Sequence, residues 1–156
     1  MIGNMSASAS EVHPKLFIAN EWRPSHTGQT FETVDPSTEE VIASIPRGGA
    51  EDVDDAVSAA REAFNGPWRR LTPEDRARFL YQVARSLESR LEEFARLETL
   101  DTGKPLQHSR NEIRNCVRYF DYYAGAADKI HGETIPLGPN YLDYTVREPL
   151  GVTAHI

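Results

Sequence analysis

The sequence has little of several features that define common protein classes. One cysteine in 156 residues allows no internal disulfide, so a reducing compartment, the cytoplasm, is expected. No apolar run approaches the roughly 20 residues that a membrane-spanning helix requires, so no membrane association is expected. Positive charge is also scarce, with 17 Lys and Arg against 24 Asp and Glu and a net charge of -7. Because phosphate binding needs a basic surface, this balance argues against a nucleic-acid partner.

Nucleotide-binding and metal-binding motifs are absent too. Neither a GxGxxG turn after a strand nor a GxxxxGK[ST] loop occurs. Gly48-Gly49 precedes a predicted helix and could expose amides to an anion, although a plain turn is the commoner use of such a pair. The histidines have no metal-ligand spacing on one element, and one cysteine completes no zinc set. A transition-metal site is therefore not expected.

Cys116 and a group of aromatic residues share one predicted helix. Cys116 falls on the apolar stripe of that helix, so we interpret it as a buried structural cysteine and not as a nucleophile. The aromatic group is expected to pack in the core, because base stacking would need a basic surface around it. Its members are Tyr119, Phe120, Tyr122 and Tyr123.

The two ends of the chain differ in character. Residues 1–14 are small and polar, without the basic and apolar segments of a signal peptide, and are predicted to be a disordered tail. Residues 151–156 are mainly apolar and β-prone, whereas domains usually end in exposed polar residues. This contrast predicts a piece of a larger protein.

Hydrophobic periodicity gives strands, then helices, then strands. Strands are predicted at 15–22 and 30–34, joined as a hairpin through the turn residues 24–28, with a third at 40–45. Two further strands are expected at 141–147 and 150–156. The pattern is a mixed α/β fold without a complete βαβ unit.

Three helices are predicted between these strands. The first begins near Glu51 and ends before Gly66, and the third runs from Leu106 to Lys129. The second has the clearest start, because Thr72 can cap it and Pro73 suits its first position. Its apolar stripe continues without a break as far as the Thr-Gly-Lys-Pro stop at 102–105.

Asp101 lies at the carboxyl end of that second helix. A carboxylate there opposes the helix dipole by about 0.3–1 kcal/mol, so a compensating partner is expected. The amides of Thr102 and Gly103, or the ammonium of Lys104, would suffice. A bound cation would also suffice, and the spacing alone does not decide between them.

Several stretches, taken together and in order, resemble the amino-terminal third of the NAD(P)-dependent aldehyde dehydrogenase superfamily. The resemblance covers about residues 15–156, and its most specific stretch, 97–105, is similar to betaine-aldehyde and general-aldehyde members. The stretches that carry it are 16–22, 31–38, 40–43, 51–64, 97–105 and 147–152.

The resemblance implies an architecture. Residues 15–135 would form the amino-terminal part of the cofactor-binding domain, with the initial strands and three helices. Residues 136–149 would form a β-arm that pairs with a neighbouring subunit in a homo-oligomer, a dimer or a tetramer. Residues 150–156 would supply the first strand of a Rossmann-like sheet. The expected fold class is therefore α/β, an incomplete amino-terminal portion of the aldehyde dehydrogenase fold.

The resemblance also implies a chemistry. Family members oxidise a small aldehyde to a carboxylic acid with NAD or NADP, through a cysteine nucleophile that lies downstream of the matched part. No catalytic residue is therefore assigned, and this chain alone is expected to be inactive. Ile156 is the one position matched to the cofactor cleft. A structural K⁺ or Na⁺ would bind the backbone carbonyls of Thr33 and Val34 and the carboxylate of Asp101.

Two hypotheses follow from the sequence. The first is the amino-terminal segment of an aldehyde dehydrogenase, in which the helix at 106–129 contributes to the substrate tunnel. The second is a truncated, non-catalytic homologue that acts as an assembly or interaction module. The aldehyde, and the choice between NAD and NADP, depend on residues outside the matched part.

Overall fold

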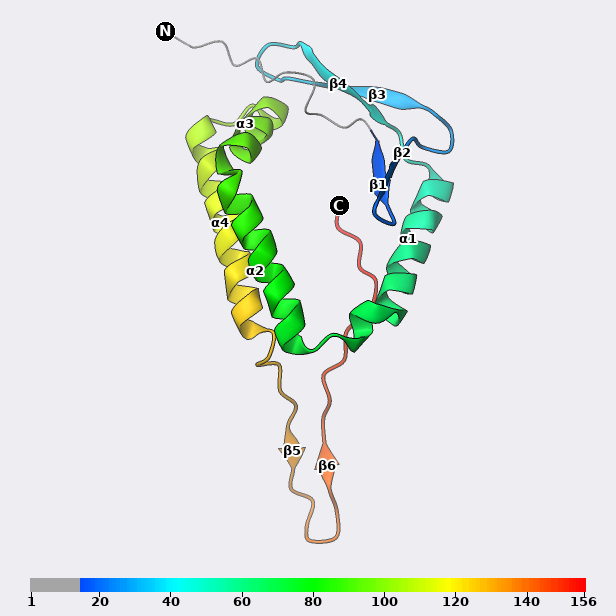
Figure 1. Cartoon of the computed structure of the whole chain (residues 1–156), viewed down its shortest axis with the longest axis vertical. Helices are drawn as coiled ribbons and strands as arrows, with labels where there is room; N and C mark the ends of the chain where they lie inside the picture. The colour runs from blue at the N-terminus through cyan, green and yellow to red at the C-terminus, as the bar shows by residue number, and fades with distance from the viewer. Residues whose placement is uncertain (1–14) are drawn as a thin grey trace.

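The structure is a computed structural model that describes residues 15–156, so the tail predicted at 1–14 lies outside the described residues. Three antiparallel strand pairs and four α-helices follow one another along the described chain. Figure 1 shows α1 on one side of the molecule and the pair α2 and α4 on the other, with β3 and β4 above them and the β5–β6 hairpin projecting from the opposite end. The α/β composition expected from the sequence is confirmed.

The first two strands, β1 (Leu16–Ile18) and β2 (Glu21–Arg23), form a tight hairpin of their own. The two residues between them, Ala19 and Asn20, have φ angles of 53° and 64°. Positive φ at both central positions is typical of the two-residue turn whose twist matches an antiparallel pair. The predicted single strand over 15–22, paired with 30–34, is therefore wrong, because the chain already reverses inside it.

The strand β3 (Thr30–Val34) pairs instead with β4 (Val41–Pro46). Phe31 lies opposite Ile45, and the register shifts between Thr33 and Val34. A bulge of this kind bends a strand and redirects its side chains. The strand predicted at 40–45 is confirmed within one residue at each end.

The first helix, α1 (Ala50–Asn65), matches its prediction, and the short 3₁₀ helix η1 (Pro67–Arg70) follows it. The Gly49 amide donates a 2.9 Å hydrogen bond to the carboxylate of Asp52, the third residue of α1. That carboxylate occupies the place where an external anion would bind, so the Gly48-Gly49 pair acts as a plain helix start.

The second predicted helix is two helices. α2 (Pro73–Ser89) starts as expected, since the Asp75 amide donates to the Thr72 hydroxyl over 3.1 Å. It ends at Ser89, because Arg90, with φ of -112° and ψ of 22°, leaves the helical region, and α3 (Leu91–Thr102) begins directly afterwards. The continuous helix is therefore wrong: the apolar period runs through the break, but the backbone changes direction there so that α3 packs on α4 separately from α2.

The last helix, α4 (Leu106–Ala126), ends three residues before its predicted end, where the Ala127 amide bonds to Ala124 in a tighter turn. α4 packs along α2 and also against α3. In the described part the buried apolar residues are few and mostly small, which allows the helices to approach closely. They are Ala84, Ala95, Val117 and Ala124.

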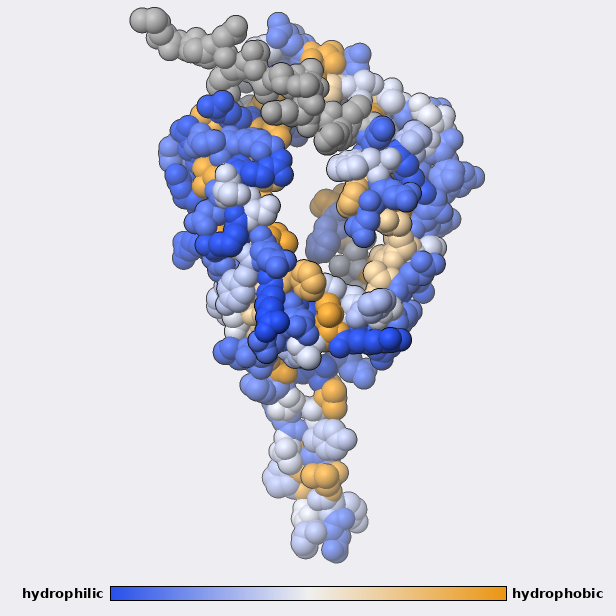
Figure 2. Space-filling view, viewed as in Figure 1, coloured by the Kyte–Doolittle hydropathy of each residue, from blue (hydrophilic) through white to orange (hydrophobic). Residues whose placement is uncertain are grey.

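The projecting hairpin consists of β5 (Thr134–Ile135) and β6 (Asp143–Tyr144). The hairpin starts at Thr134, before the β-arm expected at 136–149. Its second strand is shorter than the strand predicted at 141–147. Residues 150–156 contain no strand, so that prediction is wrong for this structure. A strand needs a neighbour to satisfy its amides, and within the described part no other strand pairs with this segment. Figure 2 shows apolar patches along the arm and beside the opening at the centre of the molecule.

Candidate functional site

The turn that follows β3 is fixed by its own polar groups. The Ser37 amide donates to the Asp35 carboxylate over 2.7 Å, and the Asp35 amide donates to the Glu40 carbonyl over 2.9 Å. Asp and Ser side chains commonly bond to nearby backbone in this way and so define a turn. We call residues 35–38 the acidic turn.

The second turn of the site closes α3. Gly103 adopts the left-handed conformation, with φ of 73°, and its amide donates to the Thr99 carbonyl over 2.9 Å. A β-carbon at Gly103 would lie 2.8 Å from Cγ of Pro36 in the acidic turn. The two turns, more than 60 residues apart in sequence, are therefore in contact.

Beside this contact, β3 meets the end of α3 directly. The Thr33 hydroxyl donates a 3.0 Å hydrogen bond to the Asp101 carboxylate. Two of the three residues predicted to bind a cation are thus brought together, and Val34 follows Thr33 in the same strand. No group of three or more His, Cys, Asp or Glu side chains suited to a metal occurs in residues 15–156. A cation at this junction would therefore depend on backbone carbonyls.

Lys104 is not the partner of Asp101. Its ammonium donates 2.6 Å hydrogen bonds to Glu98 of α3 and to Glu112 of α4. The bond to Glu112, then the bond to Glu98, raises the pKa of Lys104. The ammonium therefore fixes the turn between α3 and α4 and leaves the helix-end charge of Asp101 to the Thr33 hydroxyl.

A second link joins the same two helices from inside. The hydroxyl groups of Thr99 and Ser109 are 2.8 Å apart, and Ser109 is fully buried. Because both groups are removed from much of the solvent, each supplies the hydrogen bond that the other would otherwise lack. Together with Lys104, this pair holds the end of α3 in place.

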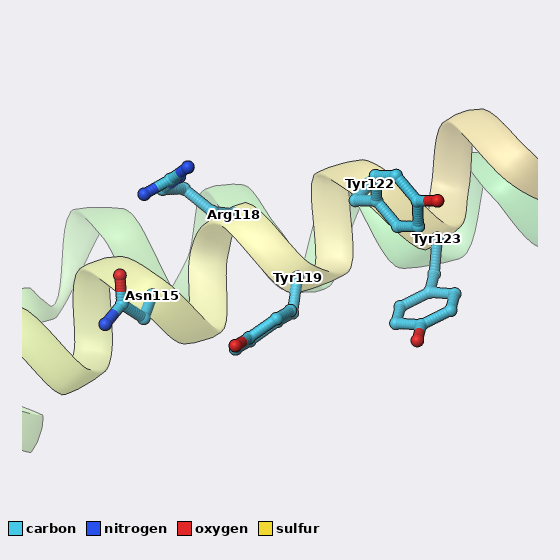
Figure 3. A pocket seen from close by; sticks show the side chains of 5 residues that line it. All are labelled: Asn115, Arg118, Tyr119, Tyr122 and Tyr123. Carbon is cyan, nitrogen blue, oxygen red and sulfur yellow. The ribbon is translucent and has the colours of Figure 1, made fainter.

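A pocket of about 300 Å³ lies on the outer surface of α4 and is lined by Asn115, Arg118, Tyr119, Tyr122 and Tyr123. Figure 3 shows Tyr119 and Tyr123 pointing to one side of the helix. Arg118 and Tyr122 point to the other side (Figure 3). The rings of Tyr122 and Tyr123 meet edge to face, 5.2 Å apart. The pocket thus offers aromatic surface with polar ends.

This arrangement corrects two expectations. Cys116 is exposed, not buried, because the buried face of α4 is centred on Val117 and Ala124. The three tyrosines are also exposed, between 62% and 69%, so they do not pack in the core. The spacing of apolar residues alone did not distinguish the buried face of α4 from the exposed one, because apolar and aromatic residues nearly surround this part of the helix.

Ile156, the position matched to a cofactor cleft, is fully exposed. The structure therefore brings it to no other predicted site residue, and its role stays a prediction. No helix in the described part of the chain is long and apolar enough to cross a membrane.

Sequence comparison identifies a family. The profile described as the Aldehyde dehydrogenase family matches residues 22–156. Aldehyde dehydrogenase 1 of Tanacetum cinerariifolium is 48% identical, over 99% of this chain and 32% of its own length. Mitochondrial aldehyde dehydrogenase of Rattus norvegicus is 46% identical, over 91% of this chain and 28% of its own length. The chain thus spans about 30% of these relatives.

Structure comparison agrees. The NAD⁺ complex of an aldehyde dehydrogenase from Bacillus cereus superposes with a TM-score of 0.85 at 45% identity, over 87% of this chain and 28% of that one. A betaine aldehyde dehydrogenase from Staphylococcus aureus gives 0.77 at 37% identity, over 80% of this chain and 26% of that one. The described fold is therefore part of the fold of these enzymes, and the resemblance noted from the sequence is confirmed.

Proposed function

This chain belongs to the aldehyde dehydrogenase family, and on that premise we propose that it is the amino-terminal segment of an enzyme that oxidises an aldehyde to a carboxylic acid with NAD⁺ or NADP⁺. The observation that carries the proposal is the family match over residues 22–156. The relatives reported above are named as aldehyde dehydrogenases, which favours this function over a non-catalytic assembly module. The NAD⁺ complex of the Bacillus cereus enzyme supports NAD⁺ as the cofactor.

The chemistry divides between this segment and the rest of such an enzyme. A cysteine thiolate outside the matched part would add to the aldehyde carbonyl; loss of hydride from that adduct would give a thioester, which water would hydrolyse to the acid and the free thiol. Bound NAD(P)⁺ supplies the hydride acceptor. Residues 15–135 support the cofactor-binding domain, and the segment at 150–156 leads into its sheet with Ile156 at the edge of the cofactor cleft.

The junction of β3 and α3 is the candidate cation site. K⁺ or Na⁺ would bind the backbone carbonyls of Thr33 and Val34 and the carboxylate of Asp101. The 3.0 Å bond between Thr33 and Asp101 supports this, because it holds the strand beside the carboxylate. Hard cations prefer oxygen donors, and a cation here would offset the negative end of the helix dipole.

The pocket on α4 is the candidate wall of the aldehyde tunnel. Exposed rings of Tyr119, Tyr122 and Tyr123 offer flat apolar surface to a substrate, and Asn115 and Arg118 offer hydrogen bonds at its ends.

The β5–β6 hairpin is the candidate arm for homo-oligomer assembly, as a dimer or a tetramer. It projects from the body (Figure 1), its two-residue strands leave backbone edges open, and Tyr141, Leu142 and Tyr144 on it are exposed. Open edges pair readily with a strand of another chain. Light scattering on the assembled enzyme should give two or four subunits, and a monomer would exclude this role.

We place the enzyme in the cytoplasm, which the single cysteine supports. Related enzymes of Arabidopsis thaliana and Rattus norvegicus are named as mitochondrial. Fractionation of the source cells decides between the two compartments, and enrichment in the mitochondrial fraction would refute the cytoplasmic one.

A chimera tests the function. Residues 22–156 would replace the matching segment of the Bacillus cereus enzyme, which is 45% identical. We expect the chimera to form NADH from NAD⁺ and an aldehyde, because the two segments share one backbone. The purified 156-residue chain should form none, since it holds no assigned nucleophile.

Two outcomes would contradict the proposal. One is NADH formation by the isolated chain with an aldehyde present. The other is a chimera that folds and assembles like the parent enzyme but binds neither cofactor nor aldehyde, which would favour the assembly module. The parent enzyme, expressed and purified in parallel, is the control for both.

A further inference from the structure

The loop between β2 and β3 is held against α1 through one histidine. Nε2 of His26 lies 2.9 Å from a carboxylate oxygen of Asp55, and its Nδ1 lies 3.7 Å from Glu51. The backbone amide of His26 also donates to Asp52 over 3.1 Å. A single loop residue thus contacts three carboxylates on the first two turns of the helix.

The charge of this cluster is unbalanced when the imidazole is neutral. The charged groups that face His26 are Glu51, Asp52 and Asp55 from α1, and Arg23 from β2. Arg23 shares Asp55 with the histidine, through a 2.5 Å hydrogen bond to the same carboxylate oxygen. One guanidinium therefore stands against three carboxylates, and a proton on His26 supplies the second positive charge.

Burial divides the cluster into a fixed part and a responsive part. Asp52 is 3% exposed and Ser25, beside His26, is 4% exposed, so the base of the loop is seated on the helix. The side chain of His26 is 45% exposed and exchanges protons with water. Protonation can therefore change the outer contact while the inner contact persists.

We propose that His26 is a pH-operated latch: the charge of the protonated imidazole against Asp55 and Glu51 holds residues 27–29 of the loop to α1, and the neutral imidazole, which keeps only one ring N–H for a carboxylate, loosens that hold. The backbone bonds to Asp52 remain in both states. Deprotonation of His26 therefore opens residues 27–29 locally, while the backbone of His26 stays bonded to Asp52. This role of His26 does not depend on the enzymatic function proposed above.

The pKa shifts give the pH window. The hydrogen bond to Asp55 raises the pKa of His26 above its ordinary 6.5. Hydrogen bonds from His26 and then Arg23 lower the pKa of Asp55 below 3.8, and the Gly49 amide chiefly lowers that of Asp52. A raised histidine pKa stabilises the closed form below 6.5, and that contribution is lost as the pH rises through the raised value. The lowered pKa of Asp55 keeps that carboxylate charged below its ordinary titration range, so its contact with the protonated ring persists in mildly acidic solution.

The test is NMR spectroscopy of the isotope-labelled full chain between pH 5 and pH 8.5. We expect the His26 ring to titrate above 6.5 and, in Asp55→Asn, to titrate closer to 6.5. Amide exchange at 27–29, corrected for the intrinsic pH dependence, should rise severalfold through the His26 titration. The Val53 amide, which bonds to the Gly49 carbonyl inside α1, is the internal reference.

Two variants separate the latch from a general loss of stability. His26→Gln should exchange like the open form at every pH, and His26→Arg like the closed form. A variant that unfolds would be recognised by loss of protection at Val53, and the wild-type titration then decides alone. A His26 ring that titrates at or below 6.5, or exchange at 27–29 that follows Val53 through the titration, would overturn the proposal.

Discussion

Replacing Gly103 by alanine tests the contact between the two turns of the candidate site. Gly103 has φ of 73°, in the left-handed region, and a β-carbon there would lie 2.8 Å from Cγ of Pro36. Real contacts of that kind essentially never fall below 3.0 Å. The acidic turn at 35–38 must therefore move away from the end of α3, or the helix end must move instead.

The cost has two parts. A non-glycine residue in the left-handed conformation costs about 1–2 kcal/mol. Forcing an added carbon into a close contact costs about 1–3 kcal/mol more, because the proline ring is rigid. The free energy of unfolding should therefore fall by about 2–5 kcal/mol.

Gly28 offers a matched control within the same chain. It has φ of 65°, but nothing lies within 4 Å of the β-carbon that alanine would add. Gly28→Ala should therefore lose only the conformational part, about 1–2 kcal/mol. The difference between the two variants measures the contact with Pro36.

Urea unfolding of each variant, followed by circular dichroism, measures these losses. Pro36→Ala removes the clashing carbon, so the double variant with Gly103→Ala should recover most of the steric part. Equal losses for Gly28→Ala and Gly103→Ala, with no recovery in the double variant, would refute the contact between the turns.

Two further changes test the neighbouring groups. Ser109→Ala should lower the free energy of unfolding by about 1–3 kcal/mol, because the Thr99 hydroxyl loses its partner. The double change with Thr99→Val should be closer to neutral in the same urea assay, because no hydroxyl is then left without a partner. A double variant no more stable than Ser109→Ala would contradict this. In the chimera described above, K⁺ or Na⁺ should raise the unfolding temperature above that in tetramethylammonium at equal ionic strength. Asp101→Asn, which keeps an oxygen for Thr33, should abolish the difference, and an equal response of the chimera with and without this change would exclude the cation site.

Local chemistry made parts of this fold predictable. Thr72 was expected to cap α2, and the Asp75 amide indeed donates to its hydroxyl. The Thr-Gly-Lys-Pro stretch at 102–105 was expected to stop a helix, and Gly103 closes α3 there in the left-handed conformation. Both features could be predicted from neighbouring residues, because a helix cap or a C-terminal glycine satisfies backbone groups only a few positions away.

Other features of the fold depend on packing between segments, which the residues next to them in sequence do not determine. The reversal at Ala19-Asn20 has no glycine to mark it, so the first hairpin was missed. The break at Arg90 interrupts an unbroken apolar period, because α3 packs on α4 separately from α2. Cys116 and Val117 are adjacent on α4, yet only Val117 faces the other helices.

The candidate site shows where the limit of sequence reasoning lies. The helix-end carboxylate of Asp101 raised the question of its partner, and the nearest cation in sequence, Lys104, was one answer. Glu98 and Glu112 both bind Lys104, and they lie six and eight residues from it. With Lys104 engaged there, Asp101 is left to a hydroxyl 68 residues away. The electrostatic need could be predicted from one helix, but the group that meets it is set by competition among several carboxylates, which only the packed structure resolves.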